Sequence, residues 1–110
     1  LRAVIASADL VVTGEGRLDA QSLGGKVPVG VARLAAPAGV PVVAFAGSLA
    51  GDVDAFRGEG ITLALPIVDA PMPLERAMTG ADALLERAAS RFARALALGH
   101  GLGHGLGRVR

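Results

Sequence analysis

The chain contains no cysteine, and its two histidines both lie in a glycine-rich stretch near the carboxyl end. The absence of cysteine excludes disulfide bonds and thiolate metal sites. His100 and His104 alone make a poor set of zinc ligands, because no further ligand stands near them in the sequence. We therefore expect no structural zinc site.

Aromatic residues are also scarce, with three phenylalanines and no tryptophan or tyrosine, and the formal net charge is only +1. Proteins that bind single-stranded nucleic acid combine a basic surface with aromatic rings on which bases stack. The sequence offers neither feature, so nucleic acid is not an expected partner.

Long apolar runs are missing as well. No uncharged apolar run reaches the roughly 18 residues that indicate a membrane helix. No charged region precedes an apolar segment with a cleavage site, as a secretory signal would require. We therefore expect no membrane partner and a cytoplasmic location.

What the sequence does contain is the segment order of one α/β unit. The chain has 110 residues, of which 52% are hydrophobic and 19% charged, a composition outside the range of disordered proteins. Apolar runs predict buried parallel strands over 10–12, 42–46 and 61–65. Helical spacing predicts helical segments over 1–7, from Pro28 to about Pro37, over 52–56 and over 74–96. This order predicts a three-layer α/β sandwich with a mainly parallel, Rossmann-like sheet, present as a partial domain.

The first full helix has clear signals at both ends. Pro28 suits the first turn of a helix, and Gly39 suits the cap that follows it. We expect its apolar face to contain Val27, Val31, Leu34 and Ala35.

The last helical segment carries one apolar stripe, expected to cover the sheet and formed by Leu74, Met78, Ala81, Leu85, Ala88, Phe92 and Leu96. Thr79 and Asp82 have the spacing of a capping box, which together with Gly80 predicts either a kink or two helices end to end. Met72 and Met78 are interpreted as packing residues. The later arginines, Arg87, Arg91 and Arg94, are interpreted as a solvated face.

Alternate glycines follow this segment from Gly99 to Gly107. Such a repeat cannot pack a core, so we expect a flexible Gly/His-rich tail over 99–110 and a structured unit over 1–98.

The residues that carry chemistry follow the first predicted strand. Glu15 is flanked by Gly14 and Gly16, which predict a tight loop because glycine adopts backbone angles closed to other residues. Arg17 and Asp19 come next and are expected to project from the same loop. In open α/β sheets ligands bind at the carboxyl ends of the strands, where this loop would lie.

Two nucleotide-binding motifs are not met here. The dinucleotide fingerprint fails because Asp19 stands where its third glycine belongs, and the P-loop motif fails because Val27 follows Lys26. What remains is a loop with two acids and two bases, a set able to bind Mg²⁺, phosphate and a small carboxylate.

Each of these residues also has a purely structural interpretation. Glu15, Arg17 and Asp19 could form an ion-pair network that only fixes the loop. Lys26 could be an exposed loop lysine. Ser48, which follows the second predicted strand, either presents its hydroxyl at the same sheet edge or makes a turn.

The same region resembles a known family. The residues Asp9-Leu-Val-Val-Thr-Gly-Glu-Gly-Arg-Leu-Asp19, Gln21-Ser22-Leu23, Gly25-Lys26, Pro28-Val-Gly-Val-Ala32 and Pro41-Val-Val-Ala-Phe-Ala-Gly-Ser-Leu49 resemble the C-terminal part of bacterial glycerate kinases that use ATP on D-glycerate. The resemblance extends over residues 1–98, which correspond to the last quarter of a typical family member.

The resemblance implies transfer of the ATP γ-phosphoryl group to D-glycerate with Mg²⁺, and it favours 2-phosphoglycerate over 3-phosphoglycerate as the product. It implies that Arg17 holds the glycerate carboxylate or the moving phosphate, that Glu15 or Asp19 accepts the hydroxyl proton or holds Mg²⁺, and that Lys26 offsets phosphate charge. Gly14, Gly16 and Ser48 would line the same substrate and phosphate site.

The resemblance also implies a partner, the missing N-terminal part of the same enzyme. The chain begins at Leu1 without a methionine, which fits a fragment, a broken reading frame or processing. We expect the isolated chain to be inactive. Two alternatives remain: a non-catalytic α/β module that binds an anion or nucleotide, and an inactive truncated fragment that needs the rest of the enzyme to fold.

Overall fold

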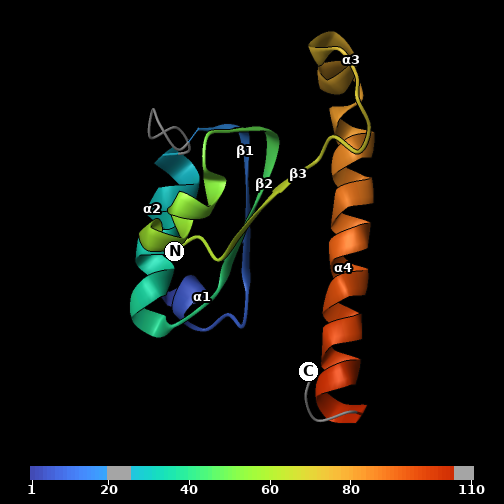
Figure 1. The fold of residues 1–110 in the computed structure, drawn as a ribbon. Helices are drawn as coiled ribbons and strands as arrows, with labels where there is room; N and C mark the ends of the chain where they lie inside the picture. The colour runs from blue at the N-terminus through green and yellow to red at the C-terminus, as the bar shows by residue number, and fades with distance from the viewer. Residues whose placement is uncertain (20–25, 106–110) are drawn as a thin grey trace.

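The computed structural model describes residues 1–19 and 26–105. Figure 1 shows the chain as a small sheet with helices on both sides. Its elements are, in chain order, α1 (Arg2–Ala6), β1 (Val11–Asp19), α2 (Lys26–Ala35), the 3-10 helix η1 (Ala36–Ala38), β2 (Val42–Ala50), the 3-10 helix η2 (Val53–Glu59), β3 (Leu63–Pro66), α3 (Leu74–Thr79) and α4 (Ala81–Gly105).

The three strands form one parallel sheet in the order β1-β2-β3. Val11 pairs with Val42, and Val43 pairs with Leu63. The predicted parallel sheet is confirmed, but the strand bounds differ. β1 continues past Thr13 to Asp19 and β2 continues past Ala46 to Ala50, while β3 begins only at Leu63.

The expected three layers are present. Figure 1 shows α1, α2 and η2 on one side of the sheet and α4 on the other. The buried residues accordingly form two clusters, one between the sheet and α2 and the other between the sheet and α4. The fold is therefore an α/β sandwich with a parallel sheet, as predicted.

The larger cluster is built where α2 packs on the sheet. Pro28, Ala32 and Ala35 are the buried residues of α2, so the helix approaches the sheet through small side chains. Val27 was expected on this face, but it is 61% exposed. Gly60 adopts a positive φ of 95°, and a Cβ added there would lie 3.2 Å from the Ala32 Cβ, so two features require glycine at this position.

The smaller cluster holds α4 against the opposite face of the sheet. Val43, Phe45 and Ala88 are buried there, and the rings of Phe45 and Phe92 meet edge to face with centroids 5.8 Å apart. An aromatic pair in this arrangement contributes about 0.5–1.5 kcal/mol beyond the area it buries.

The predicted stripe of the last helical segment is confirmed only in part. Ala88 and Phe92 pack in the cluster against the sheet. Leu84 is also buried, although it lies outside the predicted stripe. Leu74, Met78, Leu85 and Leu96 are exposed. The break at Gly80 separates α3 from α4 and takes Leu74 and Met78 out of the stripe.

The predicted pair of helices end to end is confirmed, but the capping box is wrong. The Thr79 hydroxyl donates back to the Glu75 carbonyl at 2.8 Å, so it closes α3 instead of capping α4. The Gly/His-rich segment also differs from expectation, because α4 continues to Gly105. Residues 99–105 are therefore helical, and residues 106–110 lie outside the described part of the chain.

Within the described residues, no helix has both the length and the apolar character that crossing a membrane requires.

Candidate active site at the carboxyl ends of the strands

The candidate residues lie on the ends of two paired strands. Glu15, Arg17 and Asp19 belong to β1, and Ser48 belongs to β2, where its Cα is the register partner of Arg17. Because the strands are parallel, all four residues lie at the carboxyl edge of the sheet, the edge where α/β folds bind ligands. The location predicted from the sequence is therefore correct.

The predicted tight loop around Gly14 and Gly16 is wrong. Both glycines lie inside β1, and the described glycines with positive φ are Gly39, Gly51 and Gly60. The position where closeness of the two backbones requires glycine is Gly47 of the paired strand β2. A Cβ on Gly47 would lie 2.7 Å from the carbonyl oxygen of Gly16, so β1 and β2 approach each other at a point where a side chain has no room.

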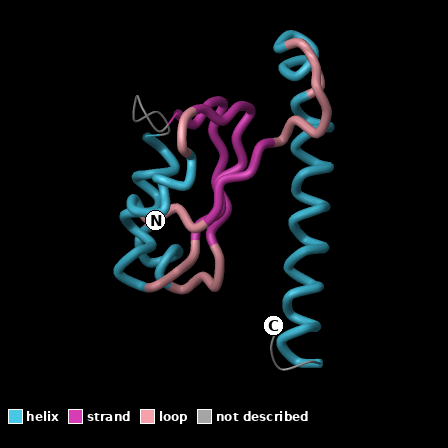
Figure 2. The backbone as a smooth tube through the Cα atoms, viewed as in Figure 1, coloured by secondary structure: helices cyan, strands magenta, loops and turns pink. Residues whose placement is uncertain are grey.

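The strands change direction at this close contact. Val11 and Leu18 both pack in the cluster beneath α2 although they stand an odd number of positions apart in one strand. Strict alternation would place them on opposite faces, so the alternation shifts between them. Figure 2 shows the carboxyl ends of β1 and β2 curving toward the layer that contains α2, whereas β3 leads toward α4.

This bend determines which candidate residues share a side. Leu18 is fully buried beneath the bend, so its neighbours Arg17 and Asp19 face away from that core. The Arg17 guanidinium lies 3.4 Å from the Asp19 carboxylate, with side chains 63% and 19% exposed. An ion pair this open contributes at most about 1 kcal/mol to stability, which leaves Arg17 free to exchange partners.

Glu15 lies on the other side of Gly16. Its Oε1 accepts a hydrogen bond from the Gly16 N–H at 2.9 Å, which holds the carboxylate near the backbone of the bend. Lys26 begins α2, but its side chain lies outside the described residues, as do Gln21, Ser22, Leu23 and Gly25 of the motif.

A cavity of about 220 Å³ adjoins this edge and lies between the strand ends and the last two helices. Glu15, Gly16, Gly47 and Ser48 line it from the strands, and Ile67, Val68, Leu74, Ala77, Met78 and Ala81 line it from the following segments. Gly14 lines a neighbouring cavity beside Leu85 of α4. Met78, interpreted from the sequence as a packing residue, is instead 69% exposed on the cavity wall.

The carboxylates at this edge that could bind Mg²⁺ are those of Glu15 and Asp19. The described residues contain no group of three or more acidic, histidine or cysteine side chains that would form a complete metal cage. Mg²⁺ bound with a nucleotide needs only one or two protein carboxylates, because water and phosphate oxygens supply the other ligands. Glu15 and Asp19 therefore fit a nucleotide-bound Mg²⁺ but not a metal held by the protein alone.

One charged group was missed by the sequence analysis. Arg87 Nε donates to Asp69 Oδ2 at 2.8 Å, and Arg91 lies 3.7 Å from the same oxygen, so these arginines are not simply a solvated face. The hydrogen bond from Arg87 lowers the pKa of Asp69, and the same bond raises the pKa of Arg87. The pairing joins the segment after β3 to α4, a contact that no local sequence pattern encodes.

Comparison with known proteins agrees with the geometry. A profile of the glycerate kinase family matches residues 1–97. The glycerate kinase of Halalkalibacterium halodurans is 47% identical over 90 residues, covering 82% of this chain and 24% of the relative. The glycerate 2-kinase of Escherichia coli is 42% identical over 90 residues, covering 82% of this chain and 24% of the relative.

A crystal structure from Salmonella typhimurium, assigned as glycerate kinase 2, superposes with a TM-score of 0.67 at 36% identity and covers 92% of this chain and 25% of that chain. The chain therefore spans about a quarter of the length of the relatives that it matches. With a parallel α/β sheet, an acid–arginine–acid strand end and a family profile that matches almost its whole length, the chain belongs to the glycerate kinase family.

Proposed function

We propose that this chain supplies one wall of the active site of an enzyme that transfers the γ-phosphoryl group of ATP to D-glycerate. The observation that carries the proposal is the placement of Arg17, Asp19 and Ser48 on the outward side of two paired strand ends, beside a cavity. Phosphoryl transfer depends on positioning and charge neutralisation more than on covalent chemistry, and these side chains suit that demand. We favour the 2-hydroxyl as the acceptor, which gives 2-phosphoglycerate.

Each side chain has a role that its chemistry supports. The planar guanidinium of Arg17 can hold the glycerate carboxylate or the transferred phosphate with two parallel hydrogen bonds. Asp19 or Glu15 would accept the proton of the attacking hydroxyl. The Ser48 hydroxyl can donate to a substrate oxygen, and Lys26 would offset phosphate charge.

Mg²⁺ would be held by Asp19 or Glu15, whichever of the two does not accept the proton, together with the phosphates of ATP. A bound Mg²⁺ would neutralise the negative charge that develops on the phosphate oxygens. The protein side chains then orient the substrate, and Arg17 is accessible enough to do so.

Because the chain spans about a quarter of its relatives, we propose that the remainder of the enzyme is its partner and that the isolated chain is inactive. A non-catalytic module that binds an anion or nucleotide is the second candidate. It is favoured by the cavity that adjoins the strand ends.

The test is a chimera in which this chain replaces the matching segment of the Halalkalibacterium halodurans relative. We expect ATP-dependent phosphorylation of D-glycerate, with the position of the phosphate read by NMR of the product. Arg17→Ala or Asp19→Asn should lower turnover at least about a hundredfold, the usual cost of a lost group that stabilises the transition state.

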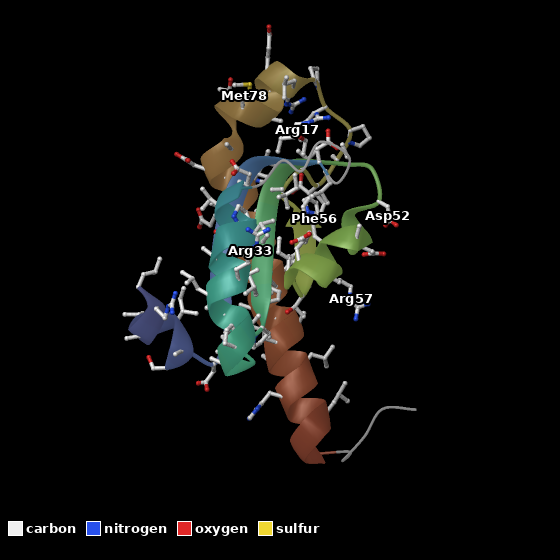
Figure 3. The ribbon with its side chains drawn as sticks, turned by 90° about the vertical axis from the view of Figure 1, so that its left-hand side faces the viewer. Arg17, Arg33, Asp52, Phe56, Arg57 and Met78 are labelled. Carbon is white, nitrogen blue, oxygen red and sulfur yellow. The ribbon has the colours of Figure 1, made fainter. Side chains whose placement is uncertain are left out.

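The matched control is Arg33→Ala, because Arg33 is also exposed, at 73%, and pairs with an acid, Glu59, away from the strand ends. Figure 3 shows Arg33 on the helix layer, apart from Arg17. The Arg33→Ala change should leave turnover unchanged. A folded chimera that does not phosphorylate glycerate would contradict the proposed function, and near-normal turnover of Arg17→Ala would contradict the site.

A further inference from the structure

The cavity beside the strand ends has mostly apolar walls, although charged residues lie next to it. Its helical wall consists of Leu74, Ala77, Met78 and Ala81, all of them uncharged. Neither Arg17 nor Asp19 lines it. Figure 3 shows Met78 on α3 at the same end of the molecule as Arg17.

The charge of the cavity excludes one class of ligand. Among the described residues that line it, Glu15 is the ionisable one, and its carboxylate would repel a phosphate or the carboxylate of glycerate. Pockets with apolar walls and a few polar groups are typical sites for small ligands and cofactors, and their walls suit the largely apolar part of such a ligand. Of the two proposed substrates, only ATP has such a part, its adenine base.

The cavity is also continuous with the charged edge. Ser48 lines the cavity and is the register partner of Arg17, and neighbouring strands lie about 4.8 Å apart. A nucleotide with its base in the cavity could therefore extend its phosphates past Ser48 toward Arg17, and away from Glu15. The exposed thioether of Met78 would gain a favourable contact with the ring.

We propose that this cavity binds the adenine base of ATP, with Ala77 and Met78 against the ring and Ser48 at the exit toward the phosphates. The proposal builds on the proposed function, because that function supplies ATP as the ligand. It adds the direction in which the nucleotide lies.

The test uses the two methionines of the chain as reporters, since Met78 lines the cavity and Met72 does not. The 110-residue chain is labelled with ¹³C at the methionine methyl groups and titrated separately with adenosine and with D-glycerate. Adenosine should shift the Met78 signal saturably and leave Met72 in place. D-Glycerate should shift neither signal.

Two substitutions separate a filled cavity from a general disturbance. Ala77→Phe places a ring in the cavity and should weaken the response to adenosine at least about tenfold, a loss of about 1.4 kcal/mol of binding free energy. Ala83→Phe makes the same change at an exposed position of α4 outside the cavity and should leave the response unchanged. If the Ala77→Phe variant does not fold, Ala77→Leu replaces it, because leucine fills less of the cavity.

A Met78 signal that ignores adenosine would overturn the proposal, and so would an equal response in a folded Ala77→Phe or Ala77→Leu variant. The same titration is repeated on the chimera. If the Met78 signal responds to adenosine in the isolated chain but not in the chimera, another part of the enzyme fills the cavity, and the proposal is contradicted for the enzyme. The assay needs no turnover. An inactive chimera with a responsive Met78 would therefore contradict the kinase function and leave the base site in place.

Discussion

Gly47 is the residue on which the geometry of the strand ends depends. The atom that its Cβ would meet is a backbone oxygen of Gly16, which cannot rotate away as a side chain could. Any larger residue must separate β1 from β2 at the point where Arg17 and Ser48 face each other. Of Gly14, Gly16 and Gly47, it is therefore Gly47, which no motif singled out, that has the strictest steric requirement for glycine.

We predict that Gly47→Ala destabilises the chain by about 1–3 kcal/mol, the usual cost of forcing extra volume into a packed site. The measurement is the free energy of unfolding in urea. Gly16→Ala is the matched control, because a Cβ on Gly16 meets nothing within 4 Å, and it should change stability by less than about 0.5 kcal/mol. Equal stability of the two variants would show that the strands are not held this closely.

The sequence predicted the order and type of the elements better than their limits. Apolar runs located β1 and β2, since burial on both faces leaves a mark in composition, as at Val42 to Ala46. The continuation of β1 through Glu15 and Arg17 had no such mark. It is stabilised by pairing with β2, a tertiary contact between segments far apart in the sequence.

The candidate site was predictable in its residue types and only partly in its shape. Arg17, Asp19 and Ser48 come together because the register of β1 and β2 aligns them. The cavity wall on α3 could not be predicted, because Leu74 and Met78 read as one stripe with the residues of α4. The break at Gly80 removes them from that stripe and leaves them exposed.

The last helix is attached to the sheet at two kinds of contact. Phe92 packs on Phe45 in the apolar cluster, and Arg87 bonds Asp69 in the segment that follows β3. The second contact depends on pH. Because the pKa of Asp69 is lower in the folded chain than its ordinary value, the stabilisation is present above the ordinary carboxylate pKa of about 3.9.

We predict that Asp69→Asn lowers the urea midpoint of unfolding at pH 7 and that this difference shrinks as the pH falls through the lowered pKa of Asp69. The sign follows because acid protonates the carboxylate and removes the contribution from the parent chain itself. In an Arg87→Met background the same substitution should have a smaller effect, because only the longer contact with Arg91, at 3.7 Å, remains. A difference that stays constant from pH 7 to pH 2.5, or that grows in acid, would contradict the role given to this pair.

The folded chain is more elongated than a compact domain with the same number of residues. Its radius of gyration is 14.9 Å and its extents are 43 × 29 × 26 Å, whereas a compact chain of this length has a radius of about 13 Å. The 25 residues of α4 account for the long axis, since they span about 37 Å at 1.5 Å per residue. The helix therefore extends past the small sheet, which leaves apolar residues such as Leu96 and Leu98 exposed.

Within residues 1–19 and 26–105, no strand pairs with the outer edge of β1. Purely parallel sheets are normally covered on both faces, yet Val12 of β1 is 52% exposed and β1 is an edge strand. An edge strand presents unpaired backbone groups to any strand that can add to it. We infer that the remainder of the enzyme covers β1 and its outer face.

This inference predicts an uneven gain in protection when the rest of the enzyme is present. Amide hydrogen exchange of the isolated chain, followed by mass spectrometry, should be faster in β1 than in β2, because β2 is paired on both sides. In the chimera, exchange in β1 should slow at least about tenfold, whereas the central part of β2 should change least. Equal slowing throughout the sheet would instead indicate that the rest of the enzyme raises global stability, and unchanged exchange in β1 would place the contact elsewhere.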